Sequence, residues 1–169
     1  MAQARGGATR AQERFVEEVG LTTEADGLPR IAGRLFGHLL LSPAPQSLDE
    51  IAESLSVSKG SVSTDARLLM SHGWLRRTTI SGDRKDYYEL APDFFAGIVA
   101  YRLRRWSALH DLVAETRPEL GAESQPVIER FRYLDEAQSF FVDGLRKLLE
   151  EWQDGKTIRG SLDDADIAE

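Results

Sequence analysis

The stretch SLDEIAESLSVSKGSVSTDARLLMSHGWLRRTTISGDRKDYYEL, residues 47–90, decides the fold of this chain. Ser47 with Glu50 three residues later forms a capping box, which predicts the start of a short helix. Ser58 can be the N-cap of a second helix that we expect to run to about Ser71. Two capped helices so close together indicate a helix-turn-helix. Their predicted buried positions are Leu48, Ile51, Ala52 and Leu55, then Val62, Ala66 and Leu69.

Gly73 supplies the C-terminal stop of the second helix, and the chain beyond it changes to strand formers. Residues 74–80 and 86–90 predict two strands of a hairpin, with Arg84 and Lys85 at its basic tip. A basic hairpin tip is usually only a solvated turn, but this one has the spacing that a wing requires. We therefore predict a mainly α-helical winged helix-turn-helix with a two-stranded β wing.

Helical patterns flank this stretch on both sides. Before it, we expect a short helix over residues 10–19 and another from Pro29, which is stopped by residues 42–45 (Ser-Pro-Ala-Pro). After it, we expect a longer helix from Pro92 to about Glu115 and a break at residues 118–126. The predicted winged unit therefore carries helices at both ends.

The last predicted helix, roughly residues 127–152, carries a heptad seam. The seam could fold back on its own chain as core. Because the winged helix is small and the helices at both of its ends need partners, we favour dimerisation through the N- and C-terminal helices. The seam residues recur at alternating steps of four and three: Val127, Phe131, Leu134, Gln138, Phe141, Leu145, Leu148 and Trp152.

These patterns divide the chain into four parts. We expect an N-terminal tail and helix (1–28), a winged helix-turn-helix DNA-binding domain (29–91), a helical dimerisation arm (92–153) and a solvated acidic tail (154–169).

Length and composition limit the class of protein. A chain of 169 residues has room for one compact domain, or for a small domain with a helical extension. The absence of cysteine excludes disulfides, thiolate metal sites and cysteine nucleophiles. No segment reaches the length of about 18 apolar residues that spans a bilayer, and residues 1–14 lack the apolar run of a signal peptide. We expect a soluble cytoplasmic protein that does not bind membranes.

The net charge of −7 is unevenly distributed. Residues 56–110 carry 9 positive and 5 negative charges, net +4, whereas residues 111–169 carry 7 and 15, net −8. A basic middle segment inside an acidic chain favours a local DNA-binding surface over general coating of nucleic acid.

Residues 47–90 resemble the DNA-binding core of MarR-type transcriptional regulators. The matching motifs are IAESL, VSKGSVS, HGWLRR and SGDRKDYYEL, and the resemblance extends more weakly from Ile31 to Trp106. Within that family the chain is most similar to the GbsR-like branch, the choline-sensing repressors of glycine-betaine synthesis. Asp65 departs from the common pattern, which has an apolar residue at this position, but this branch often carries a polar residue there.

The resemblance implies a symmetric homodimer that places two recognition helices about one turn of double-stranded DNA apart. It also implies repression by blocking polymerase, relieved by a small-molecule effector bound between the arm and the winged domain. The effector and the residues that bind it stay unassigned.

The candidate DNA-binding residues lie on the second helix and the wing. A recognition helix enters the major groove near its N-terminus, which selects the residues from Ser58 to Arg67 that face outward. The resemblance implies that Arg84 and Lys85 reach the adjacent minor groove or its phosphates. Of two neighbouring arginines on a strand, Arg76 and Arg77, only one can point at DNA. The full set is Ser58, Lys59, Gly60, Ser61, Ser63, Thr64, Arg67, Arg76, Arg84 and Lys85.

Other functions find little support in the sequence. The chain has no G-x-S-x-G, no Gly-rich phosphate loop and no H-E-x-x-H, so we expect neither an enzyme nor a cofactor. The three histidines lack metal-ligand spacing. Several aromatic residues could line a cage for a quaternary ammonium, but core positions fit them better. We interpret the cluster Arg102, Arg104 and Arg105 as solvated or paired. The main alternative to a DNA-binding regulator is a winged-helix adaptor that binds protein.

Overall fold

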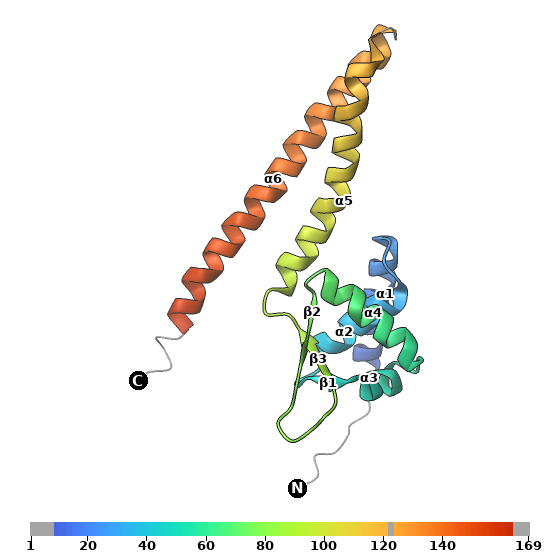
Figure 1. Cartoon of the computed structure of the whole chain (residues 1–169), viewed down its shortest axis with the longest axis vertical. Helices are drawn as coiled ribbons and strands as arrows, with labels where there is room; N and C mark the ends of the chain where they lie inside the picture. The colour runs from blue at the N-terminus through green and yellow to red at the C-terminus, as the bar shows by residue number, and fades with distance from the viewer. Residues whose placement is uncertain (1–8, 122–123, 164–169) are drawn as a thin grey trace. The chain divides into compact units, whose positions relative to one another are not determined.

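The computed structural model describes the backbone of residues 9–121 and 124–163, with side chains through residue 155. The chain forms two compact units, residues 1–94 and 95–169. The first contains α1 (Arg10–Ala25), α2 (Arg30–Leu40), β1 (Gln46–Ser47), α3 (Leu48–Leu55), α4 (Lys59–Ser71), β2 (Leu75–Thr78) and β3 (Tyr87–Leu90). The second contains almost all of α5 (Phe94–Thr116), the 3-10 turn η1 (Arg117–Leu120) and α6 (Gln125–Asp163) (Figure 1).

The two helices of the helix-turn-helix begin where their caps predict. The Ser47 Oγ accepts a hydrogen bond from the Glu50 N–H, and the Glu50 carboxylate accepts one from the Ser47 N–H at 2.9 Å, which closes the capping box. The Ser58 Oγ caps α4 by accepting from the Ser61 N–H at 3.1 Å. Gly73 ends α4 with a φ of +75°. These local predictions are confirmed.

The core of the first unit lies between α2, α3 and α4. Leu35, Ile51, Val62 and Leu69 are its largest fully buried side chains. Phe36 extends this core, because its ring meets Trp74 at 5.2 Å and Phe94 at 5.6 Å between centroids. The α3 and α4 positions predicted as buried lie below 9% exposure, apart from Leu48, which is half-buried.

The sheet has one strand more than predicted. β3 lies in the middle, with β2 on one side and β1 on the other, and both pairs are antiparallel. β1 consists of only two residues, Gln46 and Ser47, which face Tyr88 and Tyr87. No strand pattern marks so short a segment, because its strand character comes from the pairing with β3.

Two helices are longer than predicted. α1 continues past Val19 to Ala25, although Gly20 and two threonines are weak helix formers, because packing against α2 buries Thr23. α6 continues past Trp152 to Asp163. The predicted acidic tail therefore begins inside this helix, and its residues 164–169 lie outside the described part of the chain.

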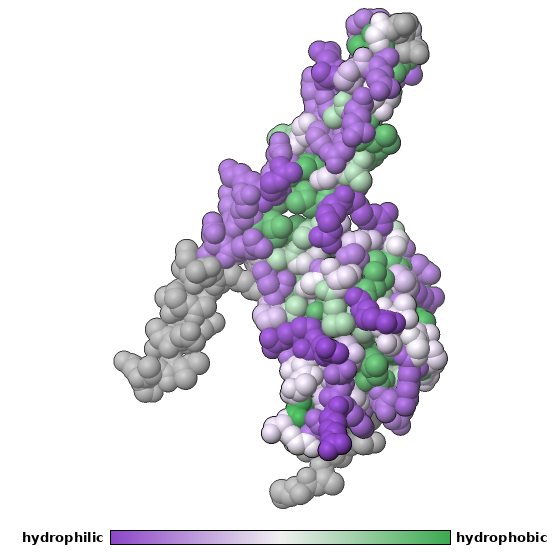
Figure 2. Space-filling model, viewed as in Figure 1, coloured by the Kyte–Doolittle hydropathy of each residue, from purple (hydrophilic) through white to green (hydrophobic). Residues whose placement is uncertain are grey.

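The second unit, the arm, is a hairpin of α5 and α6. Trp106 stacks on Phe141 at 3.9 Å between ring centroids, and Phe95 meets Trp152 at 5.2 Å. Arg117 of η1 forms an ion pair with Asp135 of α6. Many apolar side chains of the arm stay exposed, and Figure 2 shows hydrophobic patches on its surface. Among the described residues, no helix is long and apolar enough to cross a membrane.

Candidate nucleic-acid interface

Helix α4 has one buried and one outward face. Val62, Asp65, Ala66 and Leu69 are buried. The predicted DNA-binding residues lie on the other side. Ser61 and Ser63 are half-buried, and the exposed ones are Ser58, Lys59, Gly60, Thr64 and Arg67. This face therefore offers small hydroxyls and two cations around the N-terminus of the helix, where a recognition helix meets DNA.

An acidic residue of α3 lies beside the start of α4. The Lys59 Nζ is 2.6 Å from the Asp49 Oδ1. The hydrogen bond from Lys59 lowers the pKa of Asp49, and the positive charge of Lys85 on the wing acts in the same direction. Asp49 therefore forms an ion pair with Lys59 alone, and the charge of Lys85 adds only a weaker electrostatic influence. Asp49 lies in the first turn of α3, and sequence reasoning does not find its pairing with Lys59, because the pairing depends on how α3 and α4 cross.

The arginines of strand β2 also meet carboxylates. Arg76 faces Glu89 across the hairpin, and its Nε lies 2.8 Å from the Glu89 Oε1. The Arg77 Nη1 lies 3.2 Å from the Asp86 Oδ2. Both arginines are exposed, although alternation along the strand sends their side chains to opposite faces. Exposed ion pairs of this kind contribute little stability, so a phosphate can replace the carboxylate.

The wing tip is shaped by Asp83. Its carboxylate accepts hydrogen bonds from the Lys85 N–H at 2.9 Å and from the Tyr87 hydroxyl at 2.7 Å. The bond from Tyr87 lowers the pKa of Asp83, and the same bond raises the pKa of Tyr87. The side chains of Arg84 and Lys85 are exposed and form no ion pair within the described part of the chain. They are therefore available to a phosphate without breaking a contact.

Asp65 is buried at the α4 position where the family pattern has an apolar residue. The residue is 6% exposed, and burial raises the pKa of its carboxyl. No described residue gives it a hydrogen bond or an ion pair. Because burial disfavours the charged form of a carboxyl group, an acidic residue is less favourable at this α4 position than an apolar one.

The aromatic residues that could have lined a cage for a quaternary ammonium pack elsewhere; they are Trp74, Tyr87, Tyr88, Tyr101 and Trp106. Trp74 and Tyr88 are buried in the first unit, and Trp74 meets Phe36 edge to face. Tyr101 is buried in the arm and its hydroxyl accepts a hydrogen bond from Arg105. These contacts fit core and surface packing.

The histidines are dispersed. His38 is hydrogen-bonded to Gln46 at 2.7 Å, and the His110 Nδ1 lies 4.0 Å from the Asp135 Oδ1. In the part of the chain that the structure describes, no three potential metal ligands cluster.

Known proteins resemble the chain at the level of sequence and fold. No protein-family model matches it. The HTH-type transcriptional regulator MmpR5 of Mycobacterium tuberculosis is 42% identical over 99 residues, which are 58% of this chain and 60% of that regulator. The putative HTH-type transcriptional regulator YvaV of Bacillus subtilis is 26% identical, over 86% of this chain and 81% of its own length.

A solved structure described as a transcriptional regulator matches most of the fold. It is 33% identical, covers 85% of this chain and 99% of its own, and superposes with a TM-score of 0.69. This likeness confirms the predicted fold class, a mainly helical winged helix-turn-helix with flanking helices, although the sheet has three strands. The relatives favour a regulator and none favours an adaptor. The chain therefore belongs to the helix-turn-helix transcriptional regulators.

Proposed function

We propose that this chain is a repressor of the MarR type that binds double-stranded DNA with α4 and the wing. One observation carries the proposal: the first residue of α4, Lys59, and the wing-tip residues Arg84 and Lys85 are exposed cations of one folded unit. The N-terminus of α4 and the wing tip therefore both offer cations to a ligand. This combination is what a protein needs to read a major groove and contact the adjacent backbone together.

On DNA, the contacts divide by type. The outward face of α4 carries mainly hydroxyl side chains, such as those of Ser58 and Thr64. Hydroxyl groups make few bidentate contacts to a base edge. Arg67 can bond a guanine or a phosphate. Lys59 and Arg76 would exchange their carboxylate partners for phosphates. The surface therefore supports affinity that depends strongly on salt and base selectivity that is modest for one subunit.

We also propose that the functional species is a homodimer. The arm exposes several large apolar side chains to water, which is unfavourable. A second copy of the chain would cover them. These exposed residues are Leu109, Leu112, Tyr133, Phe140, Leu148 and Trp152. A symmetric dimer doubles the DNA contacts and selects two half-sites at a fixed spacing, which compensates for the modest selectivity of one helix.

Assignment to the GbsR-like branch is the finer part of the proposal. The HTH-type transcriptional repressor GbsR of Bacillus subtilis is 24% identical over 89% of this chain and 90% of its own length. That match and the polar residue Asp65 support the branch. The assignment makes choline the first small-molecule effector to test, with loss of DNA affinity on addition as the expected result.

The wing provides the sharpest test of DNA binding. We expect Arg84→Ala with Lys85→Ala to weaken DNA binding at least about tenfold and to reduce the salt slope by about 2 per bound subunit, about 4 for the dimer, since each cation releases about one counterion. The matched control is Arg130→Ala with Arg132→Ala, which removes two exposed cations from the arm. Fluorescence anisotropy against duplex DNA at about 50 and about 200 mM salt measures both quantities. Equal losses for the two double variants would contradict the proposed interface.

A further inference from the structure

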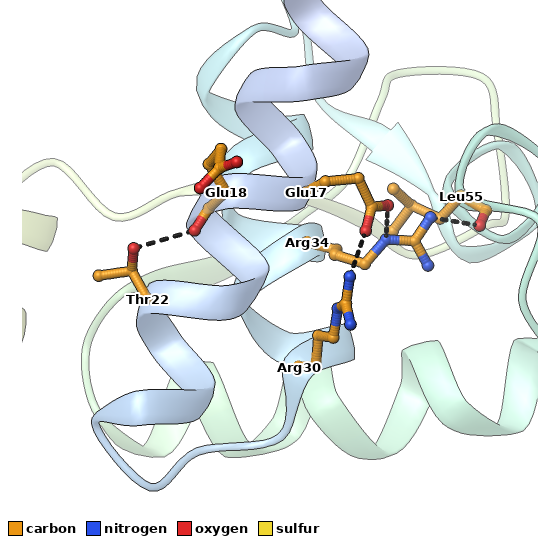
Figure 3. Close-up of polar contacts among 6 residues, drawn as sticks. All are labelled: Glu17, Glu18, Thr22, Arg30, Arg34 and Leu55. Atoms are coloured by element: carbon orange, nitrogen blue, oxygen red, sulfur yellow. Dashed lines mark hydrogen bonds and ion pairs between the residues drawn. The ribbon is translucent and has the colours of Figure 1, made fainter.

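Two arginines of α2 converge on one carboxylate of α1 (Figure 3). The Arg30 Nη2 lies 2.9 Å from the Glu17 Oε2, and the Arg34 Nε lies 2.6 Å from the Glu17 Oε1. The Arg30 side chain is 44% exposed and the Arg34 side chain is 21% exposed. The two pairs are alike in chemistry but differ in burial, so the Arg34 contact is less screened by solvent.

Arg34 makes a further contact that Arg30 lacks. Its Nη2 donates a hydrogen bond of 3.0 Å to the carbonyl oxygen of Leu55, the last residue of α3. The carbonyls in the last turn of a helix have no partner within the helix, and a cation there also meets the negative end of the helix dipole. The guanidinium of Arg34 therefore caps α3 from α2 while it holds α1 through Glu17.

The path of Arg34 across α1 depends on Gly20. A Cβ atom at position 20 would lie 2.7 Å from the Arg34 Cγ, closer than real Cβ contacts. The Cγ belongs to the stem of the side chain, so it has little freedom to move aside. A glycine at this position gives Arg34 the space to reach both Glu17 and Leu55.

The capped end of α3 is also the entrance to the recognition helix. Ser56 follows Leu55 in the left-handed region with a φ of 53°, an uncommon conformation for a residue other than glycine. Val57 returns a hydrogen bond to the Ala52 carbonyl, and Ser58 then caps α4. The orientation of Leu55 therefore determines where the N-terminus of α4 begins.

We infer that Arg34 is a positioning residue for DNA reading, which fixes the turn at residues 56–58 and the N-terminus of α4 to helix α1. This inference rests on the proposed DNA-binding function. It makes α1 part of the DNA-reading unit, and a displacement of α1 would reach Ser58 and Lys59 through Glu17, Arg34 and Leu55. No sequence pattern connects these residues, because they lie on three helices.

Arg34→Met and Arg30→Met form a matched pair for the test. Each removes one ion pair to Glu17, but only the first removes the bond to Leu55. We expect Arg34→Met to lower the affinity for the chain's own promoter about tenfold, as loss of a charge-assisted hydrogen bond does, and Arg30→Met to lower it less than about twofold. Affinity for random DNA should stay within about twofold in both variants, because the phosphate-binding cations are unchanged. Equal promoter affinities for the two variants would overturn the inference.

A second variant covers the case in which Arg34→Met does not fold. Arg34→Lys keeps the charge beside Glu17 but lacks the forked guanidinium that serves Glu17 and Leu55 together. The ratio of promoter to random-DNA affinity should fall in the same direction. A ratio equal to that of the wild type in a folded Lys variant would also overturn the inference.

Amide hydrogen exchange of the full chain tests the positioning role of Arg34 separately from the proposed DNA binding. We expect the amides of residues 56–58 to exchange faster in Arg34→Met, or in Arg34→Lys, than in the wild type, and at the wild-type rate in Arg30→Met. Unchanged exchange in the Arg34 variants would reject the positioning role. If the wild type does not prefer its promoter, the proposed DNA reading fails, while the exchange data still test whether Arg34 holds the turn.

Discussion

The winged unit, residues 1–94, and the arm differ in how far their large apolar side chains are buried. In the winged unit, Leu35, Ile51, Val62 and Leu69 are less than 2% exposed. In the arm, Leu148 is 62% exposed, and exposed side chains there also include those of Leu109, Leu112, Tyr133 and Phe140. The winged unit thus contains its own core, whereas the arm shows the surface of an incomplete one. The difference supports the proposal that the second unit is where two copies of the chain associate.

The largest loss of DNA affinity is expected from substitutions in the arm. Phe140→Glu with Leu148→Glu places two charges on its exposed apolar surface, where the single chain uses neither side chain for burial. We expect the dimer to dissociate and DNA affinity to fall by about a hundredfold or more, because the two half-sites are no longer bound together. Sedimentation velocity and anisotropy measure the two results.

The control for the arm is Glu136→Lys, an exposed polar position on the same helix. It should leave both the mass and the affinity close to those of the wild type. A dimer that survives both glutamate substitutions would show that another surface holds the subunits together, and would break the comparison between the units.

Substitution by alanine should change the free energy of unfolding much more in the winged unit than in the arm. We expect Ile51→Ala to lower the free energy of unfolding by about 2–5 kcal/mol, because it leaves a cavity in a closed core. Leu148→Ala should change the unfolding of a dilute, dissociated chain by less than about 0.5 kcal/mol. Urea denaturation monitored by tryptophan fluorescence measures both. Similar losses from the two substitutions would mean that the arm has a closed core too.

Asp65 is the exception within the winged unit, and its effect should be the smallest. Burial raises its pKa in the folded chain, so ionisation costs stability once the pH rises through that pKa. We expect Asp65→Asn to stabilise the chain by about 1 kcal/mol at pH 7, with the gain disappearing below the unfolded pKa of about 3.9. Thermal unfolding across this pH range measures the gain. A variant that is less stable than the wild type at pH 7 would show that the carboxylate has a partner.

The parts of the fold that sequence predicts are those held by local contacts. The capping box of Ser47 and Glu50, the cap Ser58 and the stop at Gly73 act within a few residues, so their pattern is visible in the chain itself. Strand β1 is missed because two residues carry no period, and only pairing with β3 makes them a strand. The ends of α1 and α6 are missed because helices continue through weak formers when packing supports them.

In the candidate interface too, sequence predicts the local features but not the contacts between helices. The outward residues of α4 and the basic wing tip follow from helix and hairpin periodicity. The Asp49 carboxylate beside Lys59 and the Leu55 carbonyl bound by Arg34 do not, since each contact joins separate helices. In the proposed interface, these contacts would determine how strongly Lys59 is held before DNA binds and how α4 is positioned.

The most direct test of the central claim is a titration of the wild-type chain against its own promoter and against random duplex DNA of equal length. Anisotropy at about 50 and about 200 mM salt gives both affinity and salt slope. We predict tight, salt-sensitive binding with at least about a hundredfold preference for the promoter at the higher salt. Equal and weak binding to the two duplexes would contradict a sequence-specific regulator and favour a winged helix that binds protein.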